Sequence, residues 1–119
     1  MIGIDIVEVE RVRRFYEKHG EDGLKRFLLP QEVERLPQIE QRKAESIAGL
    51  WAAKEAVGKA LGCGICARLG FLDIAITKDA LGAPHAQLGA HAAKLHGVSA
   101  LAVSITHEKH YAAAVAMVR

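Results

Sequence analysis

The feature that most constrains the fold is a long helical segment in the middle of the chain. The segment from 40 to 61 contains no proline, Pro37 precedes it, and Gly62-Cys63-Gly64 follows it. Its larger apolar residues recur at helical spacing, namely Ile47, Leu50, Trp51, Val57 and Leu61. This spacing predicts an amphipathic helix whose apolar stripe faces a core. The glycines predict its end, because glycine readily adopts the positive φ of a helix C-terminus.

Shorter elements are predicted on both sides of this helix. Strands are predicted at 2–7, 71–78, 98–106 and 111–118, with a short edge strand at 84–88 that contains Pro84. Helices are predicted at 8–19 and 30–36, and 89–96 is compatible with a helix. Because helices come early and a hairpin comes late, we expect the α+β class, a small mixed domain with one long helix packed on an antiparallel sheet.

Length and charge exclude several classes of protein. The 119 residues predict a single domain that spans 1–119, and a net charge of +2 is too small for a dedicated nucleic-acid binder. No apolar run approaches the roughly 18 residues of a membrane span. The first residues lack the basic and apolar regions of a signal peptide, and two cysteines are too few for a disulfide framework. We therefore expect a cytoplasmic protein that binds neither nucleic acid nor membrane.

Asp5 interrupts the isoleucine run of the first predicted strand, where aspartate is disfavoured. One interpretation is a solvent-facing residue on an alternating strand. The other is a carboxylate held on rigid backbone to bind a metal ion. The sequence leaves both interpretations open.

A second carboxylate, Glu55, lies one helical turn before Lys59. Such a pair alone indicates a surface ion pair worth about 0.2–0.5 kcal/mol. Gly58, however, costs on the order of 1 kcal/mol relative to alanine, and a helix keeps such a glycine where another element or a ligand approaches its backbone. Mg²⁺ prefers one or two carboxylates together with water and phosphate oxygens. Asp5, Glu55 and Lys59 would suit such a site, although these residue types also occur together by chance.

Other patterns do not match known sites. Gly58-Lys59 is not a phosphate-binding loop, because Ala53 and Ala60 occupy its remaining key positions. Cys63 and Cys66 have C-x-x-C spacing without a second pair for zinc, and a place after a helix does not favour thiolate formation. The segment 107–110, H-E-K-H, lacks the spacing of a zinc-binding helix. We therefore expect loop thiols without a special role and histidines that are structural or exposed.

Three segments carry a family resemblance. They are Gly3-Ile4-Asp5-Ile6-Val7-Glu8, the stretch from Ala48 to Gly62 that contains W-A-A-K-E-A-V-G-K-A-L-G, and Ser104-Ile105-Thr106-His107 followed by Tyr111-Ala112-Ala113-Ala114. In this order they resemble the holo-[acyl-carrier-protein] synthases, the small trimeric class of 4'-phosphopantetheinyl transferases. The resemblance spans nearly the whole chain, and the W-A-A-K-E-A stretch is its most specific part. It implies the phosphopantetheinyl transferase fold.

The resemblance also implies an activity. The expected reaction moves the 4'-phosphopantetheine group of coenzyme A onto a serine of apo acyl carrier protein and releases 3',5'-ADP, in support of fatty acid biosynthesis. Asp5 and Glu55 would hold Mg²⁺, with Mn²⁺ as an alternative, and together with Lys59 they would form the catalytic set. The residues implied to bind coenzyme A are Arg42, Lys59, Gly82, Pro84, Thr106 and His107.

The resemblance further implies two kinds of protein contact. Arg11 matches a first-helix arginine that meets the acidic carrier protein, and Arg14 and Lys18 extend that basic face, because the three are spaced i, i+3 and i+7. The second kind of contact joins the subunits of a homotrimer, in which the sites lie between neighbouring subunits. The family often has arginine where Leu50 stands and a polar turn residue where Leu81 stands.

Two other functions remain open from the sequence. A non-catalytic partner-binding module of the same fold would keep the basic helix and need neither carboxylate. A different metal-dependent enzyme could act on a nucleotide or pyrophosphate.

For the expected reaction, a metal-ordered water or a carboxylate could accept the serine proton, and His107 is a weaker candidate.

Overall fold

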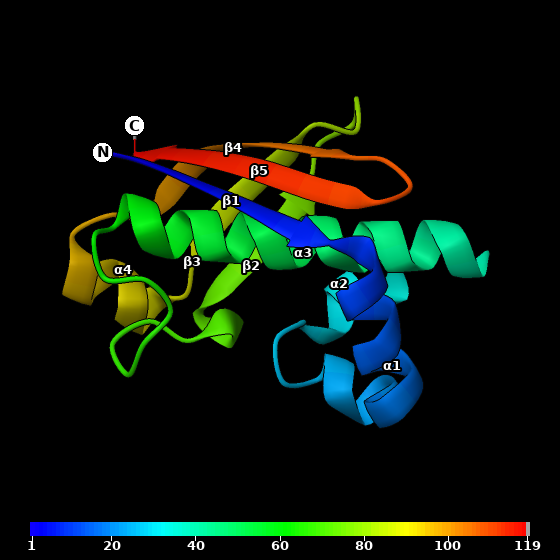
Figure 1. Cartoon of the computed structure of the whole chain (residues 1–119). Helices are drawn as coiled ribbons and strands as arrows, with labels where there is room; N and C mark the ends of the chain where they lie inside the picture. Colours follow the sequence, from blue (N-terminus) through cyan, green and yellow to red (C-terminus); the bar gives the residue numbers. More distant parts are fainter. Residues whose placement is uncertain (119) are drawn as a thin grey trace.

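The computed structural model describes residues 1–118, which form one five-stranded antiparallel sheet with helices packed against it (Figure 1). The strand order is β1-β5-β4-β3-β2. The elements in chain order are β1 (Ile2–Glu8), α1 (Val9–Leu24), α2 (Pro30–Glu34), α3 (Glu40–Ala60), η1 (Phe71–Asp73), β2 (Ile74–Lys78), β3 (Pro84–Leu88), α4 (Ala90–His96), β4 (Ala100–His107) and β5 (Tyr111–Val118). The expected long helix on an antiparallel sheet is confirmed.

The position of β3 corrects one prediction. β3 pairs with β2 on one side and β4 on the other, so it is an inner strand, and β2 is the edge. Pro84 is tolerated there because it is the first residue of the strand. The first helix breaks after His19, as predicted, because the backbone of Gly20 is not helical (φ 60°, ψ −151°), and a second helical segment within α1 then continues to Leu24.

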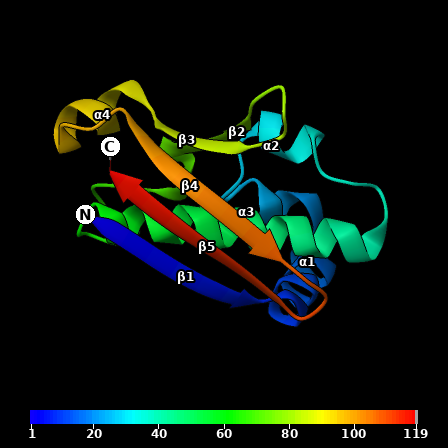
Figure 2. The same cartoon turned by 90° about the horizontal axis from the view of Figure 1, so that it is seen from above.

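Helix α3 lies beneath strands β1, β5 and β4, which run side by side across it (Figure 2). Strand β5, which lies between β1 and β4, presents three small side chains, Ala112, Ala114 and Ala116, and all are buried. Small residues allow a helix and a sheet to approach closely, so α3 can pack tightly on β5. On the same helix, Glu55 is partly buried, and the exposed Lys59 reaches β1 through its ammonium group.

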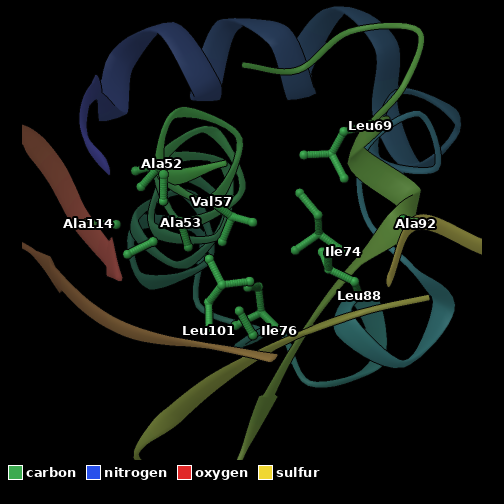
Figure 3. Close-up of a cluster of buried hydrophobic side chains, with 14 residues drawn as sticks. Ala52, Ala53, Val57, Leu69, Ile74, Ile76, Leu88, Ala92, Leu101 and Ala114 are labelled. Atoms are coloured by element: carbon green, nitrogen blue, oxygen red, sulfur yellow. The ribbon is translucent and has the colours of Figure 1, made fainter. Parts of the chain in front are cut away.

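Two apolar clusters fill the remaining space. In the first, Val57 of α3 packs with Ile74, Ile76 and Leu101 (Figure 3). In the second, Val9 and Val12 of α1 meet Phe27 and Ile47. Aromatic rings join at the edge of the second cluster, where Phe27 and Trp51 lie 4.6 Å apart between ring centroids. The second cluster attaches α1 to α3 and forms one wall of the site described below.

A buried ion pair connects α3 to α2 and, through it, to β2. The Lys54 ammonium and the Glu32 carboxylate are 2.7 Å apart and wholly buried. Lys54 also donates to the carbonyl oxygens of Phe27 and Phe71, and Glu32 accepts the Leu29 and Ile76 amides. Every polar atom of the pair therefore has a partner, which a buried ion pair requires.

Strand β1 turns its isoleucines outward. Ile2, Ile4 and Ile6 are each about two-thirds exposed, whereas Gly3 is buried against α3. Met117 lies opposite Ile2 on β5 and is half exposed. We call the surface made by Ile2, Ile4, Ile6 and Met117 the outer face. Within residues 1–118, no helix is long and apolar enough to cross a membrane.

Candidate active site

A cavity with a volume of about 430 Å³ lies between β1, α1 and α3. Its polar wall contains Asp5, Arg11, Glu55 and Lys59. Its apolar wall contains Phe15, Phe27 and Trp51. The three residues predicted to form the catalytic set therefore line one cavity, together with the first of the predicted docking arginines.

Asp5 reaches this cavity because of its place on the alternating strand. It lies on the same face as Gly3, which packs against α3, and its side chain is only 17% exposed. Lys59 donates from Nζ to Asp5 Oδ1 at 3.0 Å and to the Ile4 carbonyl oxygen at 3.0 Å. The solvent-facing interpretation of Asp5 is therefore wrong. Lys59 bonds the aspartate of β1, whereas the sequence alone suggested a surface pair with Glu55.

The electrostatics show that Glu55 is close to Asp5. Partial burial raises the pKa of Glu55, the negative charge of Asp5 raises it further, and Lys59 lowers it. Two carboxylates that repel one another across a cavity are stabilised by a cation between them. Within residues 1–118, no three His, Cys, Asp or Glu side chains gather tightly enough to hold a metal alone. This donor set fits Mg²⁺, which completes its coordination with water and phosphate oxygens.

The close approach of a neighbouring segment leaves no room for a side chain at Gly58. A Cβ atom placed on Gly58 would lie 2.8 Å from the Gly64 carbonyl carbon, and the amides of Cys63 and Gly64 both donate to the Gly58 carbonyl oxygen. The loop after α3 therefore folds back onto the helix at this glycine. The sequence allowed two reasons for a glycine at this position, the approach of another element or of a ligand. The structure shows the approach of another element.

A second cavity of about 200 Å³ contains other predicted coenzyme A residues. Gly82, Pro84 and His107 line it, and Arg35 and Lys78 add positive charge. It shares no lining residue with the first cavity. The chain thus separates the predicted site residues into a carboxylate cavity and a basic cavity.

Two predicted coenzyme A residues lie outside both cavities. Arg42 is exposed on α3. Thr106 is exposed and pairs with Ala113. Because successive residues of a strand point to opposite faces, Thr106 belongs to the outer side of the sheet, and His107 faces α3.

His107 is fixed by a residue that the sequence did not reveal. Its Nδ1 lies 3.0 Å from Glu45 Oε1, and a Cβ atom placed on Gly49 would touch its Cδ2 at 3.6 Å. Glu45 and Gly49 are one helical turn apart on α3, so the ring lies along that face. The two partners are separated by 62 positions, and no local pattern could have indicated the contact.

The predicted docking residues lie on α1. Arg11 lines the carboxylate cavity, Arg14 pairs with Glu10 at 3.7 Å, and Lys18 is exposed. The basic face therefore begins at the first cavity and extends away from it along the helix.

The two cysteines are free thiols, and Cys63 Sγ donates to the Gly58 carbonyl oxygen at 4.0 Å. The Arg68 amide lowers the pKa of the exposed Cys66, with a smaller contribution from Cys63. Burial raises the pKa of Cys63. The loop amides thus lower the pKa of one thiol, an effect that the helix-end argument alone did not predict.

Known proteins resemble the chain along nearly its whole length. The pattern of the 4'-phosphopantetheinyl transferase superfamily matches residues 1–116. A holo-[acyl-carrier-protein] synthase of Wolinella succinogenes is 49% identical over 97% of this chain and 93% of its own. The crystal structure of the Helicobacter pylori holo-[acyl-carrier-protein] synthase in complex with coenzyme A has a TM-score of 0.89 and 39% identity, with both chains covered completely. The Bacillus anthracis synthase in complex with CoA (3',5'-ADP) has a TM-score of 0.79 and 33% identity over 97% of this chain and 91% of its own.

Proposed function

The chain belongs to the 4'-phosphopantetheinyl transferase superfamily, and from that premise we propose a single-domain, Mg²⁺-dependent enzyme whose reaction centre is the carboxylate cavity. It is a holo-[acyl-carrier-protein] synthase that transfers 4'-phosphopantetheine from coenzyme A to a serine of apo acyl carrier protein and releases 3',5'-ADP. The observation that carries the assignment of the centre is the convergence of Asp5, Glu55 and Lys59 on one cavity. A cytoplasmic role in fatty acid biosynthesis is part of the proposal.

Asp5 and Glu55 would hold the metal ion. When bound, Mg²⁺ supplies positive charge to the diphosphate of coenzyme A and so favours loss of the nucleotide leaving group. Mn²⁺ has the same preference for oxygen ligands and would serve in its place. The raised pKa of Glu55 supports this role, because a cation in the cavity removes the repulsion between the two carboxylates.

The chain's own residues position and stabilise the reacting groups. In the transfer, the serine hydroxyl gives its proton to a carboxylate or a water in the cavity, its oxygen forms a bond to the β-phosphorus, and the bond from that phosphorus to the leaving 3',5'-ADP breaks. The Lys59 ammonium already lies 3.0 Å from Asp5, where it can offset negative charge that develops on the phosphate oxygens. Phe15, Phe27 and Trp51 form an apolar wall that limits competing attack by water.

The basic cavity is proposed to hold the nucleotide of coenzyme A. Arg35 and Lys78 supply positive charge, His107 adds a ring nitrogen, and Gly82 and Pro84 form its rim at the β2–β3 turn. Charge of this sign suits the phosphates of 3',5'-ADP. Arg42 and Thr106 remain proposed contacts that a neighbouring subunit would bring close.

A homotrimer with sites between subunits would unite the two cavities. The outer face supports this proposal, because a row of isoleucines on an exposed strand is apolar surface that association would bury. The carboxylate cavity of one chain would then face the basic cavity of its neighbour. This explains why one chain separates residues that act on the same substrate.

The carrier protein is proposed to dock on α1. Carrier proteins are acidic, and Arg11, Arg14 and Lys18 form a basic face that leads to the carboxylate cavity. Opposite charges speed encounter and place the serine near the centre.

The test is to incubate the protein with apo carrier protein, coenzyme A and Mg²⁺, and to follow the carrier by mass spectrometry. We expect the mass of one phosphopantetheine on the carrier serine, no gain with EDTA, and recovery with added Mg²⁺. Glu55→Ala should abolish transfer and leave the fold intact. Glu40→Gln, an exposed change on the same helix, is the matched control. Near-normal transfer by Glu55→Ala would overturn the metal assignment.

A further inference from the structure

We propose that Glu45 is a positioning residue for coenzyme A, which fixes the His107 ring so that Nε2 meets an anionic group of the nucleotide in the basic cavity. This inference rests on the proposed function of that cavity and adds a residue outside its lining. Glu45 itself is not among the residues that line either cavity.

The first step is the contact that determines which ring nitrogen is free. Glu45 Oε1 lies 3.0 Å from His107 Nδ1. An ionised carboxylate only accepts hydrogen bonds, so Nδ1 must carry the proton and donate. The remaining nitrogen, Nε2, has no protein partner within residues 1–118, and His107 lines the basic cavity. Nε2 is therefore the ring atom that is available to a ligand.

The second step is that Glu45 is itself held in place. Gln41 Nε2 donates to Glu45 Oε2 at 2.9 Å and to the Lys109 carbonyl oxygen at 3.3 Å. Arg13 of α1 donates to Gln41 Oε1. The Gln41 amide thus has a partner on each side, which defines its orientation. These hydrogen bonds hold Glu45 in one geometry, and they attach the tip of the β4–β5 hairpin to α3.

The third step concerns charge. Hydrogen bonds from Gln41 and His107 keep the pKa of Glu45 below its ordinary value, so its carboxylate is ionised at neutral pH. A protonated imidazole would donate from Nδ1 to Glu45 and from Nε2 to a phosphate oxygen. Glu45 would thereby hold a cationic donor at a fixed place beside Arg35 and Lys78. Neither Glu45 nor His107 lines the carboxylate cavity, and the basic cavity is proposed to hold the nucleotide, so loss of the contact should affect binding of coenzyme A more than the chemical step.

The experiment compares Glu45→Ala, Glu45→Gln, His107→Ala and the double variant Glu45→Ala/His107→Ala, with Glu40→Gln as the control. We measure Kd for coenzyme A by calorimetry, and KM and kcat for transfer. Glu45→Ala should raise Kd and KM for coenzyme A about tenfold, with kcat and the carrier KM little changed. Glu45→Gln should recover part of the loss, because its amide oxygen still accepts from Nδ1. In the His107→Ala background, Glu45→Ala should add nothing.

A spectroscopic measurement separates positioning from a general structural effect. In ¹⁵N-histidine spectra of the protein without coenzyme A, recorded at a pH where the ring is neutral, His107 should carry its proton on Nδ1 in the wild-type protein and lose this preference in Glu45→Ala. The inference alone is overturned if His107→Ala weakens coenzyme A binding while Glu45→Ala does not, or if the two effects add fully. If His107→Ala leaves coenzyme A binding unchanged, the proposed role of His107 fails as well, while transfer by the wild type still tests the reaction itself.

Discussion

Gly3 of β1 lies so close to α3 that a Cβ atom on it would be 2.5 Å from the Ala60 backbone nitrogen. No side chain can be accommodated there without moving the strand or the helix, because the obstacle is backbone. This contact brings β1 onto α3 and places Asp5, two residues later, beside Lys59. The glycine is therefore a structural requirement of the candidate site.

Gly3→Ala is predicted to destabilise the fold and to weaken metal binding. Overpacking typically costs about 1–3 kcal/mol, and the backbone obstacle favours the upper end. Denaturant unfolding and Mg²⁺ titration measure the two effects. Gly89→Ala is the control, because its Cβ would meet its nearest neighbour at an ordinary 3.8 Å and its φ is −61°. Equal stability of the two variants would contradict the close-packing argument.

Glu55→Gln is predicted to stabilise the metal-free protein while abolishing transfer. The folded-state pKa of Glu55 lies above its ordinary value of 4.5, so ionising it costs folding free energy. This cost is absent well below pH 4.5, appears as pH rises through that value, and is complete above the folded pKa. At pH 7 the amide removes the cost, and Tm without metal should rise.

The control for this prediction is the pH dependence. The Tm difference between Glu55→Gln and the wild type should shrink as pH falls below 4.5, and excess Mg²⁺ should stabilise only the wild type. Glu17→Gln, an exposed change on α1, should show neither effect. A Glu55→Gln variant less stable than the wild type at pH 7 without metal would contradict the burial and repulsion argument.

The sequence predicted the elements well because their signals are local. Pro37 and the glycines at 62 and 64 bound the long helix within the chain itself, and α3 ends at Ala60. Strand order depends on distant pairing, and for this reason the edge position of β3 was predicted wrongly. Proline within a strand is compatible with either an edge or a first residue, and only the sheet distinguishes them.

Local signals and distant contacts also differ in what they predict about the site. The spacing of Glu55 and Lys59 is readable on one helix, but the direction of Asp5 depends on which face of β1 meets α3. Isoleucines normally face a core, so alternation alone allowed a solvent-facing Asp5, and Gly3 was the signal that could have decided between the two interpretations. The contact between Glu45 and His107 joins residues 62 positions apart, which no periodicity encodes.

Lys54→Met is predicted to destabilise the protein by about 3–5 kcal/mol, because it leaves the Glu32 carboxylate buried without its cation. Chemical denaturation measures the loss. Adding Glu32→Gln should recover part of it, since the neutral amide needs no counter-charge. Lys25→Met, at an exposed lysine, is the control. A loss as small as that of the control would show that the pair contributes nothing to the fold.

Arg14→Glu is predicted to raise KM for the carrier protein while leaving KM for coenzyme A unchanged. The reversed charge would repel an acidic partner, and the effect should weaken as salt screens it. Steady-state kinetics at low and high salt provide the measurement. Lys94→Glu makes the same charge change on α4 and should have little effect. An unchanged carrier KM for Arg14→Glu would count against docking on α1.

Ile4→Glu is predicted to separate the subunits and to abolish transfer without unfolding the chain. Ile4 is about two-thirds exposed in the single chain, so a charge there is tolerated in the monomer but costly in an apolar interface. Light scattering gives the mass, and circular dichroism verifies the fold. Leu95→Glu, at a residue 43% exposed on α4, is the matched control for assembly. An active monomer would contradict the requirement for neighbouring chains.

Mixing two defective variants tests whether one site draws on two chains. Glu55→Ala alters the carboxylate cavity, and His107→Ala alters the basic cavity. In randomly mixed assemblies of equal amounts, about one quarter of sites between neighbours would combine an intact Glu55 with an intact His107. Co-purified mixtures should therefore exceed the activity of either variant at limiting coenzyme A. If each site lay within one chain, no intact site could form, and the mixture would fall to the average of its parents.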